Sequence, residues 1–140
     1  RLARREHGMA RILVVDDEEM DRMLVRAILE AAGHELFYAG EGDSALQLLR
    51  DNPVDLVLTD LAMPDFNGLR FIKELREEGF RVPVIAVSGR AVDQLDLAES
   101  YGADLTMIKP IDEKHLLLAV NKMLEVSRRL DQDDPWGRGW

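Results

Sequence analysis

Five short apolar runs alternate along the chain with segments whose apolar residues recur at helical spacing. The runs lie at residues 11–17, 35–39, 54–60, 82–88 and 105–108. They are short and rich in Val, Ile and Leu, so each predicts a buried β-strand rather than a helix. Within the runs, apolar and polar residues do not alternate, which is typical of parallel strands covered on both faces.

The intervening segments predict five helices, which end at about residues 32, 50, 78, 101 and 126. Gly33, Gly79 and Gly102 follow three of them and supply helix stop signals. In the first helix, the spacing predicts an inward face made by Met20, Met23, Leu24, Ala27, Ile28 and Ala31. Met107 and Met123 are also expected in the core. Strands that alternate with helices predict an α/β fold, a doubly wound five-stranded parallel sheet with five helices, in the flavodoxin-like order 2-1-3-4-5.

One folded domain is expected over residues 10–127. Residues 1–9 are polar, basic and unpatterned, and are interpreted as a disordered or expression-derived extension. Residues 128–140 are interpreted as a disordered tail or the start of a linker, although Trp136 and Trp140 leave a docking segment as an alternative.

The amino-acid composition excludes several kinds of partner and site. The formal net charge of −9 argues against direct binding of nucleic acid, which requires a basic surface. The absence of cysteine excludes disulfides and thiolate metal sites. No apolar run is long enough to cross a membrane, so no membrane partner is expected. The lack of cysteine fits a cytoplasmic location, which is the one expected.

Polar side chains follow four of the predicted strands: Asp16 and Asp17, Asp60, Ser88, and Lys109. A lone aspartate such as Asp60 would be interpreted as a loop or helix cap. The predicted strand order, however, brings the three carboxylates to one edge of the sheet. At about 5 Å and an effective dielectric near 20, each pair of carboxylates repels by roughly 3 kcal/mol, so a cation is expected among them. Hard oxygen ligands favour Mg²⁺.

Lys109 and Ser88 extend this site. The lysine ammonium suits a phosphoryl oxygen or a carboxylate, and the serine hydroxyl offers a donor to the same group. A carboxylate, a metal, a lysine and a hydroxyl together indicate phosphoryl transfer to an aspartate.

These residues resemble the receiver domain of bacterial two-component response regulators. The resemblance covers residues 11–126 and rests on five elements in order: Asp16-Asp17, Asp60, Met63-Pro64 with Gly68, Ser88, and Lys109-Pro110. It implies that Asp60 is the phosphoacceptor for a sensor histidine kinase or a histidine phosphotransfer protein.

The resemblance also assigns roles to the neighbouring residues. Asp16 and Asp17 would hold Mg²⁺ or Mn²⁺ with Asp60 and the backbone carbonyl of Ala62. Lys109 would contact the phosphoryl group, and Pro110 would follow a cis peptide bond. Ser88 would report the modification to the face formed by the fourth helix, the fifth strand and the fifth helix. There a downstream effector protein or domain, or a second phosphorylated copy of the chain, would bind.

Three positions depart from or tune this pattern. Thr106 stands where the family usually has Tyr or Phe as the aromatic half of the switch. Ala62 and Arg90 occupy the positions that tune the lifetime of the acyl phosphate. Because the apolar Ala62 cannot orient an attacking water, slow self-dephosphorylation is expected.

Three alternatives remain. A non-phosphorylated receiver could act as a docking module, although all of its acids and its lysine are present. A phosphatase of the haloacid-dehalogenase type would need a second Asp at position 62, where this chain has Ala62. A nucleotide- or flavin-binding module would need a glycine- or hydroxyl-rich loop, but residues 16–19 are all acidic. The chain is therefore expected to accept phosphate on itself rather than to turn over a substrate.

Overall fold

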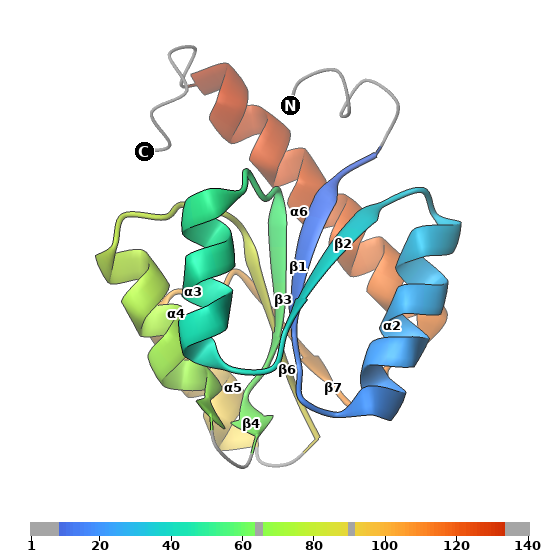
Figure 1. Ribbon diagram of the computed structural model, residues 1–140, viewed down its shortest axis with the longest axis horizontal. Coiled ribbons are helices and arrows are strands. Elements are labelled where there is room, and N and C mark those ends of the chain that lie inside the picture. Colours follow the sequence, from blue (N-terminus) through green and yellow to red (C-terminus); the bar gives the residue numbers. More distant parts are fainter. Residues whose placement is uncertain (1–8, 64–65, 90–91, 134–140) are drawn as a thin grey trace.

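The computed structural model describes residues 9–63, 66–89 and 92–133 of the chain (Figure 1). The predictions for residues 1–8, Arg90 and residues 134–140, which include both tryptophans, lie outside the described residues.

Five parallel strands form the central sheet. They are β1 (Arg11–Val15), β2 (Glu35–Ala39), β3 (Leu56–Asp60), β6 (Val84–Ser88) and β7 (Leu105–Ile108). Their order across the sheet is β2-β1-β3-β6-β7, which confirms the predicted doubly wound topology. β1 and β3 are neighbours, so the topological switch point lies where the acidic residues end their strands.

The register aligns the carboxyl ends of the strands. Val15 pairs with Thr59, Asp60 with Val87, and Ser88 with Ile108. The residues that follow these pairs therefore lie at the same edge of the sheet, which is the lower edge in Figure 1.

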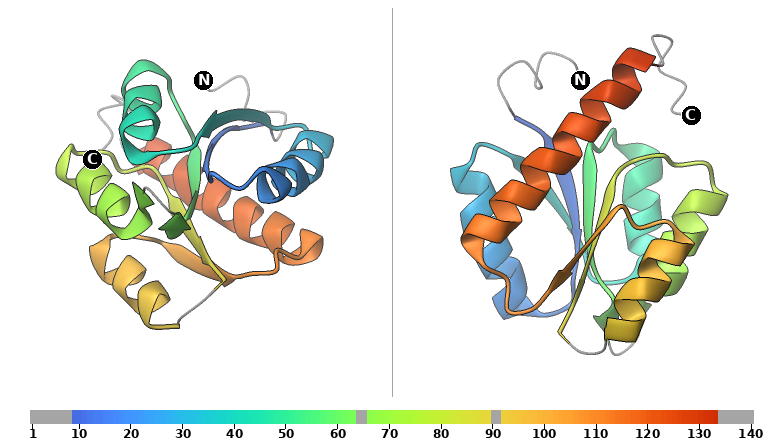
Figure 2. Two further views of the ribbon diagram at one scale, coloured as in Figure 1. Left: turned by 60° about the horizontal axis from the view of Figure 1, so that its bottom comes forward. Right: turned by 180° about the vertical axis from the view of Figure 1, so that it is seen from behind.

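Helices cover both faces of the sheet (Figure 2). On one face α2 (Glu19–Ala31) and α6 (Glu113–Asp133) pack against Ile12, Val14 and their equivalents in the other strands. On the other face α3 (Gly42–Asp51), α4 (Gly68–Glu77) and α5 (Val92–Tyr101) pack against the alternate strand residues, such as Leu13 and Val15. Burial on both faces explains why the strands are continuously apolar.

The predicted inward face of α2 was wrong. Met20 and Met23 are 73% and 60% exposed, and Leu24 is also exposed, whereas Val25, Ile28 and Leu29 are buried. Apolar residues lie on both sides of this helix and both patterns share Ile28, so periodicity alone did not fix which side faces the sheet. Of the other two methionines predicted in the core, Met123 is buried and Met107 is half-buried.

Two further features differ from the prediction. α6 continues to Asp133, beyond the predicted end near Val126, and its last turns project past the sheet (Figure 1). Residues 127–133 contain neither Gly nor Pro, so no stop signal interrupts the helix there. A two-stranded hairpin, β4 (Ala62–Met63) with β5 (Phe66–Asn67), lies in the loop after Asp60. No helix within the described part of the chain is long and apolar enough to span a membrane.

Candidate functional site: an acidic pocket at the carboxyl edge of the sheet

Asp60 ends β3 and is only 5% exposed. The chain turns back tightly onto it. The backbone N–H of Leu61 donates to the Val87 carbonyl at 3.0 Å, and the Thr59 hydroxyl donates to the Asp60 carbonyl at 3.0 Å. Gly68 then approaches so closely that a Cβ on it would lie 2.4 Å from the Asp60 carbonyl oxygen. Only glycine fits at such an approach.

Asn67 sets the direction in which the chain leaves this turn. Its side-chain oxygen accepts from the backbone N–H groups of Leu69 and Arg70, at 3.0 and 3.3 Å, and so caps α4. The Asn-Gly dipeptide therefore supplies both the helix cap and the close approach to Asp60.

Asp16 lies beside Asp60 and is 6% exposed. Its carboxylate accepts from the backbone N–H of Glu18 at 2.9 Å, and the Arg22 guanidinium donates to its backbone carbonyl at 3.3 Å. Burial raises the pKa of Asp16 to about 6, and the Glu18 N–H and the Lys109 charge only partly oppose this. The carboxylate is thus partly shielded from solvent as well as close to other acids.

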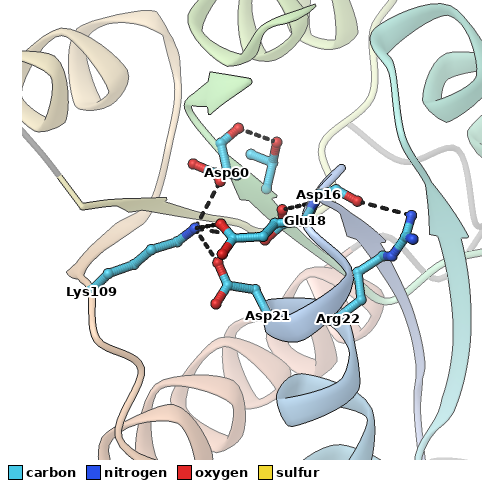
Figure 3. A network of polar contacts seen from close by, with 7 residues as sticks. Asp16, Glu18, Asp21, Arg22, Asp60 and Lys109 are labelled. Atoms are coloured by element: carbon cyan, nitrogen blue, oxygen red, sulfur yellow. Dashed lines mark hydrogen bonds and ion pairs between the residues drawn. The ribbon is translucent and has the colours of Figure 1, made fainter. Parts of the chain in front are cut away.

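Lys109 reaches into the pocket from the end of β7 (Figure 3). Its ammonium Nζ lies 2.8 Å from Asp60 Oδ2 and 2.5 Å from Asp21 Oδ2, with Asp16 and Glu18 oxygens at 3.8 and 3.9 Å. Burial alone would lower the pKa of Lys109. The hydrogen bonds to Asp21 and Asp60 outweigh burial and raise the pKa above its usual value, so the lysine is cationic.

Asp21 belongs to this pocket and was missed by the sequence reasoning. It lies in the first turn of α2, just after the acidic residues 16–19. No helical spacing pointed to it, because the acids that precede it at residues 16–18 lie before the helix, which begins at Glu19.

Carboxylate oxygens of Asp16, Asp21 and Asp60 all lie within 4.8 Å of one another. Hard anionic oxygens at this spacing, beside a buried edge, fit the ligand preferences of Mg²⁺. Asp17 is exposed and is not in this group of three. The backbone of Ala62 pairs with Asn67 in the hairpin just after Asp60.

Ser88 and Pro110 lie at the same edge. Ser88 is buried at the end of β6, and its carbonyl accepts from the backbone N–H of Lys109 at 2.9 Å. The peptide bond between Lys109 and Pro110 is cis.

Thr106 is separate from the pocket. It pairs with Ala86, two residues before Ser88, and is half-buried. It lines a hollow of about 530 Å³ beside β7, together with residues of α5 and α6 that include Leu95, Leu118 and Ala119. The threonine therefore lies on the face that the sequence resemblance associates with output.

Comparison with known proteins identifies the family. The family model described as response regulator receiver domain matches residues 12–121. Protein PilH of Pseudomonas aeruginosa is 34% identical over 119 residues, which cover 83% of this chain and 98% of PilH. The transcriptional regulatory protein CpxR of Escherichia coli K12 is 35% identical over 126 residues, which cover 89% of this chain and 53% of CpxR.

A solved structure agrees with these matches. NtrX from Brucella abortus, in complex with ADP, superposes with a TM-score of 0.84 at 32% identity, and covers 90% of this chain and 29% of NtrX. The chain thus spans about half of CpxR and less than a third of NtrX. With the strand order and the acidic pocket, these matches show that the chain belongs to the family of response regulator receiver domains.

Proposed function

We propose that this domain is a phosphoacceptor in a two-component phosphorelay and that Asp60 takes the phosphoryl group. The donor is a phosphohistidine of a sensor histidine kinase or of a histidine phosphotransfer protein. The observation that carries this proposal is the contact of the buried Asp60 carboxylate with the Lys109 ammonium at 2.8 Å, with Asp16 beside them.

The transfer is a displacement at phosphorus. An Asp60 carboxylate oxygen forms the new P–O bond while the P–N bond to the donor imidazole breaks, and the imidazole leaves with the electron pair. Lys109 faces the reacting carboxylate and lowers the cost of bringing a second anion to it. The Ser88 hydroxyl, at the end of the neighbouring strand, is the donor proposed for a phosphoryl oxygen.

Receiver domains bind Mg²⁺ at an acidic pocket, and the donor set here fits that ion. Asp16, Asp17, Asp60 and the Ala62 carbonyl are the proposed ligands, and Mn²⁺ could take the same place. When bound, the ion neutralises negative charge on the phosphoryl oxygens. Beside it, Lys109 supplies a second positive charge.

The output surface is proposed to be the face formed by α5, β7 and α6. Leu97, Tyr101, Ile108 and Leu118 are exposed on these elements, and Ile108 and Leu118 line the same hollow as Thr106. Exposed apolar groups of this kind mark an interaction site. In this proposal the phosphorylated domain binds a downstream effector protein or domain through this face, and a phosphorylation-dependent homodimer is the alternative output.

The domain is proposed to work in the cytoplasm and to act as a substrate rather than as an enzyme. It accepts phosphate on itself, and slow self-dephosphorylation is the only turnover expected of it. Ala62 and Arg90 are proposed to tune the lifetime of the acyl phosphate.

The test is incubation with acetyl phosphate and Mg²⁺, followed by measurement of the intact mass. The wild type should gain one phosphoryl group, whereas Asp60→Ala should gain none. Asp43→Ala is a matched control, because it removes an exposed acid of α3 and should leave phosphorylation intact. A wild type that binds Mg²⁺ but gains no mass would instead favour a docking module that works without phosphorylation.

A further inference from the structure

Lys109 is held by two carboxylates rather than one. Its ammonium contacts Asp21 at 2.5 Å and Asp60 at 2.8 Å (Figure 3). We propose that Asp21 is a positioning residue that competes with the phosphoryl group for Lys109 and so slows the phosphorylation of Asp60. This inference rests on the proposed function.

Lys109 has a limited number of hydrogen-bond donors. An ammonium has three N–H bonds, and two of them point to Asp21 and Asp60. The second carboxylate comes from α2, whereas the phosphoacceptor ends β3. The third N–H remains for an incoming phosphoryl group, so Lys109 would share its positive charge between that group and Asp21.

Asp21 also places a carboxylate close to the phosphoacceptor. An Asp21 oxygen lies within 4.8 Å of an Asp60 oxygen, so a phosphoryl group on Asp60 would come close to a further negative charge. At this distance a unit charge pair changes an equilibrium or a rate by more than tenfold, even at an effective dielectric near 20. Lys109 screens part of this repulsion, so we expect a net effect of roughly three- to tenfold on the rate.

The opposite possibility is that Asp21 helps phosphorylation by aiming Lys109 at Asp60. Lys109 already contacts Asp60 directly at 2.8 Å, and its side chain is only 18% exposed. The bond to Asp60 and this burial favour the observed position of the lysine, so the proposal gives Asp21 a competing role rather than an aiming one.

The experiment compares the rates at which acetyl phosphate phosphorylates the wild type, Asp21→Asn and Asp21→Glu. Asn keeps the size and one acceptor oxygen but removes the charge, so Asp21→Asn should react three- to tenfold faster. Glu keeps the charge, so Asp21→Glu should react within about twofold of the wild type. Glu19→Gln is the matched control, because it removes an exposed acid from the same helical turn and Glu19 is not among the described ion-pair partners of Lys109.

Each variant is measured at its own saturating Mg²⁺ concentration, because loss of an acid weakens binding of the cation. Urea denaturation verifies that each variant is folded, and Asp21→Ser serves as a second neutral variant. If the neutral variants react as fast as the wild type or more slowly, the competition is overturned. The proposal is likewise overturned if Glu19→Gln reacts as much faster than the wild type as Asp21→Asn does. The removal of any negative charge from this helical turn would then have the same effect. If the wild type itself gains no phosphoryl group, the proposed function fails, and this inference fails with it.

Discussion

Gly68 lies against Asp60 so closely that the hydrogen atom on its Cα occupies the space that any side chain would need. A Cβ at position 68 would stand 2.4 Å from the Asp60 carbonyl oxygen and 2.6 Å from the Cα of Leu61. Both of these neighbours are backbone atoms, which cannot move aside as the end of a flexible side chain can.

Gly68→Ala should therefore shift the loop that presents Asp60. We expect a loss of about 1–3 kcal/mol in the free energy of unfolding, measured by urea denaturation, together with slower phosphorylation by acetyl phosphate. Gly40→Ala is the control, because a Cβ at Gly40 would meet no atom within 4 Å. An unchanged unfolding free energy for Gly68→Ala would contradict the close approach.

The orientation of α2 predicts which of its apolar residues stabilise the fold. Leu29 is fully buried, so Leu29→Ala should lower the free energy of unfolding by about 2–5 kcal/mol. Met23 is 60% exposed, so Met23→Ala should change it by no more than about 0.5 kcal/mol. Equal losses for the two variants would restore the original prediction that Met23 faces the core.

The burial of His34 should make the free energy of unfolding depend on pH. It is buried, its Nδ1 accepts from the backbone N–H of Ala10 at 3.1 Å, and burial lowers its pKa below 6.5, against the opposing effect of Asp55. The unfolded chain therefore binds a proton at a higher pH than the folded chain does. Neutral His34 therefore makes its full contribution to the free energy of unfolding above pH 6.5. This contribution is lost as the pH falls below 6.5 toward the lower pKa of His34 in the folded state.

The measurement is the urea midpoint at pH 7.5 and pH 5.5. The wild type should lose more stability between these values than His34→Asn, whose side-chain oxygen can replace Nδ1 as an acceptor but takes up no proton. His115→Asn, at an exposed position, should behave as the wild type. Asp16, whose pKa is raised to about 6, titrates in the same range in all three proteins, so the comparison isolates His34.

Under the proposed function, the residue at position 62 should set how long the acyl phosphate lasts. Ala62 offers no polar atom to orient an attacking water, so the wild-type phosphoryl group should last for minutes or longer in Mg²⁺. Ala62→Asn, which adds an amide, should shorten the half-life several-fold. The decay can be followed by intact mass after removal of acetyl phosphate, and a wild-type half-life of seconds would count against this role of Ala62.

Much of the fold could be predicted because the sheet is buried on both faces. The runs that contain Ile12–Val15 and Leu56–Asp60 could hardly form anything but central strands, and the glycines after the helices marked the ends of three of them. The strand order then placed Asp16, Asp60, Ser88 and Lys109 at one edge. These residues are close in space because parallel strands in register end together, which needs no knowledge of side-chain contacts.

The parts that could not be predicted depend on rotation and on packing. The side of α2 that faces the sheet was ambiguous because apolar residues lie on two sides of the helix. The place of Asp21 in the pocket depends on that same rotation, so both were missed for one reason. The hairpin β4–β5 has only two residues in each strand, too few for any periodic pattern to appear.

Lys109 makes two bonds that belong to different parts of the molecule. Its side chain contacts Asp60, and its backbone N–H donates to the carbonyl of Ser88 at 2.9 Å. One residue thus joins the acidic pocket to the junction between β6 and β7. Under the proposed function, a phosphoryl group on Asp60 that draws the ammonium toward itself would act on a residue that is also hydrogen-bonded to Ser88, with no intermediate residue between them.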